Sequence, residues 1–238
     1  MKYGMGPMAT PKLRAKRPSG FIETPDDIAA GVKALRRACP VMRRVHDVAG
    51  DPPLRRQAGG FEGLARIVVA QQLSTASAAA IWQRVAERIK PLSARAVLAE
   101  SEEGLRAAGL SGPKIRTLRA LSEAVASQSL DLTRLDGLDD EAVHAALCEV
   151  KGIGPWTADI YIMFSLGRAD AFAVGDLALQ IAAQHAAGLE ARPKPDELAA
   201  LAERWRPWRG VAARLLWAYY PHMRGATGRD GVKPGQPI

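Results

Sequence analysis

Cysteine and histidine are scarce in this chain of 238 residues. Its two cysteines, Cys39 and Cys148, lie far apart and belong to no C-x-x-C pair, so neither a disulfide framework nor a cysteine metal site is expected. The four histidines are scattered without the spacing of metal ligands. No apolar run is long enough to span a bilayer and no secretory signal is evident, so we expect a cytoplasmic protein without a membrane partner.

Alternation of apolar and polar residues with a period of two is also absent over any length that would form a sheet. Helical spacing is common instead, as in Phe61, Leu64, Ile67 and Val68 after a Gly59-Gly60 break. We therefore predict an all-α fold of about ten helices. One helix starts at Thr24-Pro25 and runs to about Cys39, where Pro40 interrupts it. Two helices with a bend at Ser74–Ser77 follow between residues 61 and 89. The remaining predicted helices cover residues 93–107, 114–128, 139–149, 155–166, 176–187, 195–203 and 209–219.

Positive charge is plentiful only at the two ends of the chain. The formal net charge is +8, of which residues 1–20 hold five and residues 224–238 hold two. The body therefore has little surplus charge with which to hold a polyanion. We predict that residues 1–20 form a basic disordered tail, with a non-specific DNA tether as the alternative, and that residues 224–238 form a Gly/Pro-rich tail.

The most informative stretch runs from residue 147 to residue 180. It begins with the glycine hairpin Gly152-Ile153-Gly154, which opens through Pro155 into an apolar helix. The free N–H groups at the start of such a helix can bind a phosphate, although a plain tight connection between two helices fits the same pattern. Asp176 follows one helix and one loop later, at a position suited to a helix N-cap.

Hairpin, Trp156 and Asp176 in this order resemble the helix-hairpin-helix and Gly/Pro…Asp superfamily of DNA glycosylases, over roughly residues 60–221. The resemblance implies a helix-hairpin-helix glycosylase domain over residues 21–223, with two helical lobes around a DNA-binding groove and the hairpin element at about residues 142–166. It also implies a catalytic role for Asp176, which would stabilise the cationic sugar and align the attacking water. A structural cap is the alternative role for this carboxylate.

Trp156 stands where relatives that also cut the DNA strand carry a nucleophilic lysine. The resemblance therefore implies a monofunctional enzyme that leaves the strand intact. It also implies that the face of Trp156 attracts a cationic base, although the residue fits a buried helical stripe as well. Lys151, just before the hairpin, is read as a phosphate contact or a solvated side chain.

Residues 67–74 resemble the matching segment of 3-methyladenine DNA glycosylase II. In that family this bend fills the gap left by the flipped nucleotide, which implies such a role for Gln72, with Gln71 and Leu73 as neighbours. A polar kink that caps the next helix is the alternative. The chain lacks the four cysteines of the iron–sulfur branch, so no cofactor is expected. Whether the hairpin also holds a monovalent cation is left open.

Two further segments match signatures of the same family. Lys114 follows Leu110-Ser111 and is read as a DNA contact, with an ordinary N-capped helix as the alternative. Trp208 lies within the Arg-rich and Trp-rich segment 204–209 and is read as a wall of the base pocket. Core packing and surface ion pairs are the alternative for that segment.

The resemblance as a whole predicts a base-excision repair enzyme that acts as a monomer on double-stranded DNA with damaged bases, in the cytoplasm at the nucleoid. It would flip alkylated purines, of the 3-methyladenine or 7-methylguanine type, and hydrolyse the bond to the sugar, leaving an abasic site. Two alternatives remain open. One is a glycosylase for another base, such as uracil or hypoxanthine, and the other is a non-catalytic helix-hairpin-helix module that only binds DNA.

Overall fold

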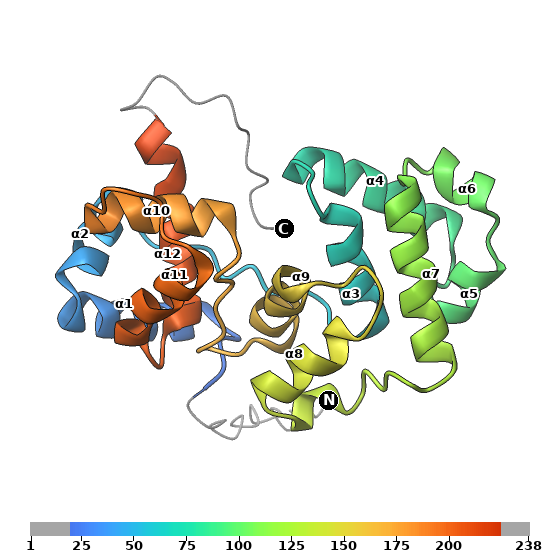
Figure 1. Cartoon of the computed structure of the whole chain (residues 1–238), viewed down its shortest axis with the longest axis horizontal. Coiled ribbons are helices and arrows are strands. Elements are labelled where there is room, and N and C mark those ends of the chain that lie inside the picture. The colour runs from blue at the N-terminus through green and yellow to red at the C-terminus, as the bar shows by residue number, and fades with distance from the viewer. Residues whose placement is uncertain (1–19, 225–238) are drawn as a thin grey trace, which may run out of the picture.

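The computed structural model describes residues 20–224, which form helices joined by turns (Figure 1). Within this range the only pairing of extended backbone is a single bridge between Phe21 and Arg168, so the predicted all-α class is confirmed. Apart from Gly20 and Arg224, the two predicted tails lie outside the described residues. The α-helices are α1 (Pro25–Ala38), α2 (Pro40–Ala49), α3 (Gly60–Ala70), α4 (Thr75–Arg88), α5 (Ala94–Ala99), α6 (Glu102–Ala107), α7 (Gly112–Ala126), α8 (Asp140–Cys148), α9 (Pro155–Ile160), α10 (Leu177–Ala187), α11 (Pro195–Ala202) and α12 (Arg209–Arg224).

The helices form two lobes that lie side by side (Figure 1). The terminal lobe contains α1, α2, α10, α11 and α12, and the central lobe contains α3 to α9. The chain passes from the terminal to the central lobe through residues 50–59 and returns through residues 167–176. The predicted arrangement in two helical lobes is therefore confirmed. Between residues 20 and 224, no helix is long and apolar enough to cross a membrane.

Local capping signals explain where α1 and α2 begin. The side chain of Thr24 accepts the N–H of Asp27 and the side chain of Asp27 accepts the N–H of Thr24, which makes the predicted start of α1 a capping box. Helix α2 was not predicted, because Pro40 was read only as an interruption. Proline is well suited to the first position of a helix, where its missing N–H is not needed, so Pro40 ends one helix and starts the next.

The predicted helix over residues 93–107 is wrong in one respect, because the structure divides it into α5 and α6. Glu100 has extended backbone, and the side chain of Ser101 accepts the N–H of Gly104 at 3.0 Å. A capping serine inside a helix-compatible stretch thus starts a new helix. At the other end of the chain, α12 continues to Arg224 instead of ending near residue 219.

The helix after the glycine hairpin has the predicted length but changes its winding. Helix α9 continues without a break into a π-helical turn, η2 (Tyr161–Leu166), and ends at Gly167 with φ +76°. The last carbonyl groups of a helix have no partner within it, so they can accept from other groups. π-Helical turns are frequent at functional sites. The predicted bend between two helices also occurs, where Ser74 caps the start of α4.

Candidate active site

Asp176 begins α10. It has extended backbone, and its Oδ1 accepts the N–H of Leu179 at 3.0 Å, so the residue is the N-cap that the sequence predicts. Asp176 is only 7% exposed. Its carboxylate lies at the positive end of the helix dipole, which favours a negative charge there.

Two tryptophan indoles donate to the same carboxylate. The Nε1 of Trp156 lies 2.8 Å from Oδ2 of Asp176, and the Nε1 of Trp217 lies 3.0 Å from Oδ1. Trp156 belongs to α9 in the central lobe, whereas Trp217 belongs to α12 in the terminal lobe. The carboxylate is therefore held by one indole from each lobe.

This arrangement leaves Asp176 some capacity to bind a further donor. An ionised carboxylate has about four acceptor positions, and three N–H groups occupy three of them. One acceptor position therefore has no donor from residues 20–224. A fixed, ionised carboxylate with one acceptor position left can both stabilise a developing positive charge and orient a water.

The glycine hairpin joins α8 to α9, as predicted. Gly152 has φ +91°, and a Cβ atom at this position would lie 2.0 Å from Thr117 Oγ1, so both the backbone and the packing against α7 require glycine. Gly154 has an ordinary φ of −100°, and a Cβ atom there would meet nothing within 4 Å. The protein's own packing gives no reason for glycine at Gly154, whereas close approach of a ligand backbone would. Within residues 20–224, the N–H groups of Gly152 and Gly154 have no hydrogen-bond partner.

The turn between α3 and α4 carries the glutamines that the sequence analysis selected. Gln71 donates from Nε2 to Thr157 Oγ1 at 2.9 Å and to the carbonyl of Gly152 at 3.4 Å, so it ties this turn to the hairpin. Gln72 is exposed and has φ +57°, and Leu73 is half-buried. The structure thus places Gln72 at an exposed bend next to the hairpin. Which of these side chains would enter DNA stays a prediction.

The two candidate lysines occupy different environments. Lys151 is exposed beside the hairpin. The Nζ of Lys114 donates to the carbonyl of Val69 at 2.5 Å, in the last turn of α3, and burial lowers the pKa of its amine. Lys114 therefore stabilises a helix end within the protein, and its contact with phosphate stays a prediction.

Trp208 packs against the first helix of the terminal lobe. Its ring lies over Gly31 of α1, where a Cβ atom would come within 2.8 Å of the ring. The absence of a side chain at Gly31 lets the indole pack against the helix. The second tryptophan at Asp176 is Trp217, nine residues further along, and the role of Trp208 as a wall of the base pocket stays a prediction. Segment 204–209 thus follows the alternative reading, of core packing and surface ion pairs.

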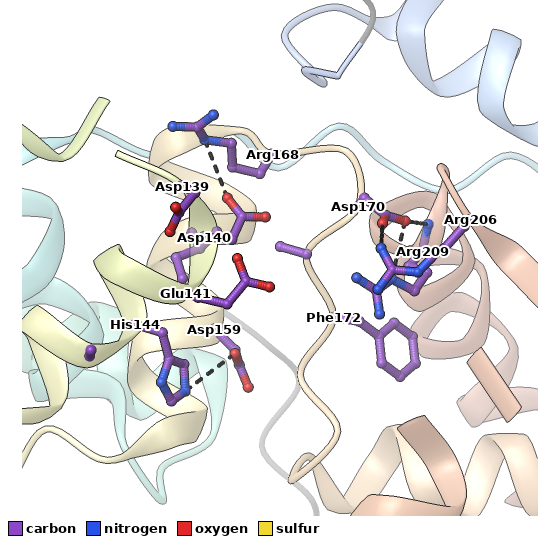
Figure 2. Close-up of a pocket in the computed structure, with 13 residues that line it drawn as sticks. Asp139, Asp140, Glu141, His144, Asp159, Arg168, Asp170, Phe172, Arg206 and Arg209 are labelled. Carbon is purple, nitrogen blue, oxygen red and sulfur yellow. Dashed lines mark hydrogen bonds and ion pairs between the residues drawn. The ribbon is translucent and has the colours of Figure 1, made fainter. Parts of the chain in front are cut away.

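A cavity of about 610 Å³ lies between the central lobe and the start of α12. Asp159 and His144 face it from one side and Arg209 from the other (Figure 2). Asp176 does not line this cavity. Burial raises the pKa of Asp159 to about 7, although the positive charge of Arg209 acts in the opposite direction. His144 Nε2 lies 3.7 Å from Asp159 Oδ1, between the two helices that flank the hairpin.

Comparison with known families identifies this arrangement. Residues 65–207 match the model of the HhH-GPD superfamily of base excision DNA repair proteins. The chain belongs to the HhH-GPD superfamily. The match covers the turn with Gln71, the hairpin, Trp156 and Asp176, and it ends before Trp217.

Similar proteins support the same assignment. A protein of Mycobacterium tuberculosis, named as a probable bifunctional transcriptional activator and DNA repair enzyme, is 33% identical over 225 residues, which cover 90% of this chain and 44% of that protein. This chain therefore spans less than half the length of that relative. The crystal structure of a DNA-3-methyladenine glycosidase from Bacillus halodurans has a TM-score of 0.71 and 33% identity, covering 82% of this chain and 91% of that one. A 3-methyladenine DNA glycosylase from Schizosaccharomyces pombe, in complex with abasic DNA, has a TM-score of 0.70 and 27% identity over 79% of this chain and 95% of that one.

Trp217 is the functional candidate that the sequence analysis missed. It is 6% exposed and lies in the last predicted helix, among apolar residues that suggested only core packing. One signal was available, because a buried indole usually requires an acceptor for its N–H. The acceptor itself lies 41 residues away in sequence and was not identifiable from the local pattern.

The two hairpin glycines should respond differently to substitution by alanine. Gly152→Ala should lower the free energy of unfolding by about 1–3 kcal/mol, because the new Cβ overlaps Thr117 and the positive φ is strained. Gly154→Ala should change it by less than about 0.5 kcal/mol. Urea unfolding of both variants measures this difference, and equal losses would contradict the packing described for the hairpin.

Asp159 should make stability depend on pH. Its pKa rises on folding from an ordinary value of 3.8 to about 7, so the folded state binds the proton more tightly and the free energy of unfolding should fall as the pH rises from about 4 to about 7. Asp159→Asn does not titrate, so above pH 7 it should be more stable than the unsubstituted protein by about 2–4 kcal/mol. Urea unfolding at pH 5 and pH 8 tests this, with Glu141→Gln on the same cavity wall as the control. Parallel pH curves for Asp159→Asn and the unsubstituted protein would contradict it.

Proposed function

We propose that this protein is a monofunctional DNA glycosylase that removes alkylated purines, of the 3-methyladenine or 7-methylguanine type, and leaves an abasic site. The observation that carries the proposal is the nearly buried carboxylate of Asp176, which receives three N–H donors and retains one acceptor position. The names of the similar proteins from B. halodurans and S. pombe support the same substrate class.

In the proposed reaction the bond between the sugar C1′ and the base nitrogen breaks, and the base leaves with the bonding electrons. Alkylation at N3 or N7 gives the purine a positive charge, so it departs as a neutral molecule and needs little help from a general acid. The sugar becomes cationic, and the ionised carboxylate of Asp176 stabilises it. Water then adds its oxygen to C1′ and loses a proton, with Asp176 orienting the water or accepting that proton.

The proposed DNA contacts use backbone groups more than surface charge. The N–H groups of Gly152 and Gly154 would donate to a backbone phosphate, and exposed Lys151 would add a charge beside them. Gln72, at the exposed bend that Gln71 ties to the hairpin, would fill the gap left by the flipped nucleotide. This arrangement suits a body that has almost no net charge.

The residue at position 156 is the reason that we propose an enzyme without strand-cleaving activity. The indole N–H of Trp156 is directed at Asp176, so the face of the ring remains the surface that a cationic base could approach. No amine stands at this position to attack the sugar and cleave the strand. The proposed hydrolysis uses water and protein groups alone and needs no cofactor. One copy of the chain supplies every group named here, so a monomer acting on chromosomal DNA is sufficient.

Asp176→Asn should lose base excision while keeping affinity for abasic DNA, because the amide retains the shape of the side chain but not its charge. We expect single-turnover excision to fall by about 100-fold or more. The assay uses duplexes with a 3-methyladenine-like, 7-methylguanine, 1-methyladenine, hypoxanthine or uracil lesion, each analysed with and without hot alkali. For the unsubstituted protein, strand breaks should form at alkylated purines and only after alkali.

Each other outcome of this assay contradicts a specific part of the proposal. Normal excision by Asp176→Asn would remove its catalytic role, and breaks without alkali would overturn the monofunctional assignment. Release of uracil or hypoxanthine alone would overturn the substrate class. No release from any lesion, together with tight binding, would favour a non-catalytic DNA-binding module.

Gly154→Ala should weaken binding to duplex DNA although it leaves the fold intact. The added methyl group would occupy the open space in front of the hairpin N–H groups, so we expect the Kd for an abasic duplex to rise about tenfold. Fluorescence anisotropy measures this change. Gly59→Ala is a matched control, since Gly59 also has an ordinary φ and open space but lies at the start of α3. Equal Kd values for the two variants would contradict the proposed phosphate contact.

A further inference from the structure

Arg214 is a positive charge buried within α12. It is 1% exposed, and within residues 20–224 its guanidinium donates only to backbone carbonyls. Burial and the nearby charges of Arg56 and Arg55 lower the pKa of Arg214 to about 9, so it remains charged at neutral pH. A buried charge without a carboxylate partner is costly, and an apolar residue of similar size is often tolerated in its place.

The three carbonyls that hold Arg214 come from different segments of the chain. Its Nε donates to Leu54 at 3.2 Å, in the connection between the lobes, and its Nη1 donates to Gly210 of α12 at 2.8 Å. Its Nη2 donates to Met163 of the π-helical turn at 3.2 Å. The planar guanidinium can reach all three at once, which a lysine amine on its flexible stem cannot reproduce. Arg214 thus joins the terminal lobe to the far end of the helix that follows the glycine hairpin. This helix consists of α9 and η2 and is called the hairpin helix below.

A chain of contacts leads from Arg214 to the candidate catalytic carboxylate. The guanidinium carbon lies 4.5 Å from the centre of the Phe164 ring, and that ring lies 5.7 Å from the ring of Trp217. Trp217 follows Arg214 by three residues, so both project from the same side of α12. Trp217 then donates to Asp176. Phe164 and Trp217 are both buried, so movement of one ring is transmitted to the other.

The hairpin helix connects the same parts from its other end. Trp156 lies at the start of α9 and donates to Asp176, while Met163 lies in the turn that continues this helix and accepts from Arg214. The position of this helix relative to α12 therefore decides whether both indoles reach one carboxylate. A shift between the two helices would lengthen at least one of the two indole hydrogen bonds.

On the basis of the glycosylase function proposed above, we propose that Arg214 is a positioning residue for the reaction. It fixes α12 against the hairpin helix, so that Trp156 and Trp217 donate to Asp176 at the same time. Arg214 does not touch the reacting atoms in this account. It acts through Met163 and Phe164 on the geometry of the carboxylate.

Arg214→Met tests this role, because methionine fills similar space without the charge or the donors. We expect single-turnover excision on saturating DNA to fall by about 10- to 100-fold, while the Kd for an abasic duplex changes by less than about threefold. Arg119→Met is the matched control, since Arg119 also donates to a carbonyl, that of Glu100 at 2.8 Å, but within the central lobe. The control should excise at the unsubstituted rate. Trp217→Phe should also slow excision, and the double variant with Arg214→Met should lose less than the product of the two single losses, because Arg214 acts in part through the Trp217 hydrogen bond that Trp217→Phe removes.

A second measurement does not depend on activity. The chain has five tryptophans, and the indole N–H resonance of Trp217 can be assigned by its absence from the spectrum of Trp217→Phe. Arg214→Met should shift this resonance and speed its exchange with solvent, whereas Arg119→Met should leave it in place. If Arg214→Met does not fold, Arg214→Lys can replace it. This variant keeps the positive charge but lacks the planar guanidinium with its several donors, so it should shift the resonance in the same way.

The two proposals fail in distinguishable ways. An unsubstituted protein that releases no base contradicts the glycosylase function, while the Trp217 resonance still reports on Arg214. A resonance that stays in place in the Arg214 variant overturns the positioning role, whether or not excision slows. Equal loss of excision in the Arg119 control also overturns it, because the effect would then be one of general stability.

Discussion

The hydrogen bonds to Asp176 are the interactions on which the rest of the structure depends. A carboxylate that is 7% exposed must have its acceptors satisfied, because an unpaired buried charge is costly. The start of α10 supplies one N–H, and the other two come from Trp156 and Trp217 in different lobes. The two lobes therefore have one relative position in which all three bonds form. The packing of α12 against α10 holds Trp217 near Asp176 within the terminal lobe, whereas the hydrogen bond from Trp156 and those from Arg214 to Leu54 and Met163 join the two lobes.

Local signals in the sequence account for most of the fold. Thr24 and Asp176 were recognisable as N-caps from their neighbours alone, and both cap helices in the structure. The errors also have local causes, since Pro40 and Ser101 were each read as part of an ending or a continuing helix, whereas both start a new one. Capping depends on a few adjacent residues, which is why this level of structure can be read from the sequence.

Contacts between segments that are far apart in the sequence could not be predicted from local signals. Trp208 lies in the Arg-rich segment 204–209 and Trp217 in an apolar predicted helix, and only the tertiary structure shows that Trp208 packs over Gly31 while Trp217 reaches Asp176. Arg214 gave no signal at all, because an arginine in a helix is normally on the solvent side. Its partners are backbone carbonyls, which every residue type possesses, so no side-chain pattern could indicate them. The family resemblance supplied Asp176 and the hairpin, and the tertiary structure supplied the residues that hold them.

Within residues 20–224, the hairpin helix has free N–H groups at its start and arginine side chains at its end, which suits an anionic ligand at its start. At its start, the N–H groups of Gly152 and Gly154 are unpaired within the described chain and face open space at Gly154. At its end, the carbonyls of Met163 and Phe164 accept from Arg214 and Arg56. The two arginines complement the negative end of the helix dipole, whereas the free N–H groups at the positive end have no partner among residues 20–224. An anion in front of the hairpin would complement that positive end. Arg214 and Arg56 therefore complement the same dipole that would hold a phosphate, so the helix that would bind the DNA backbone is also the helix that Arg214 holds against the carboxylate.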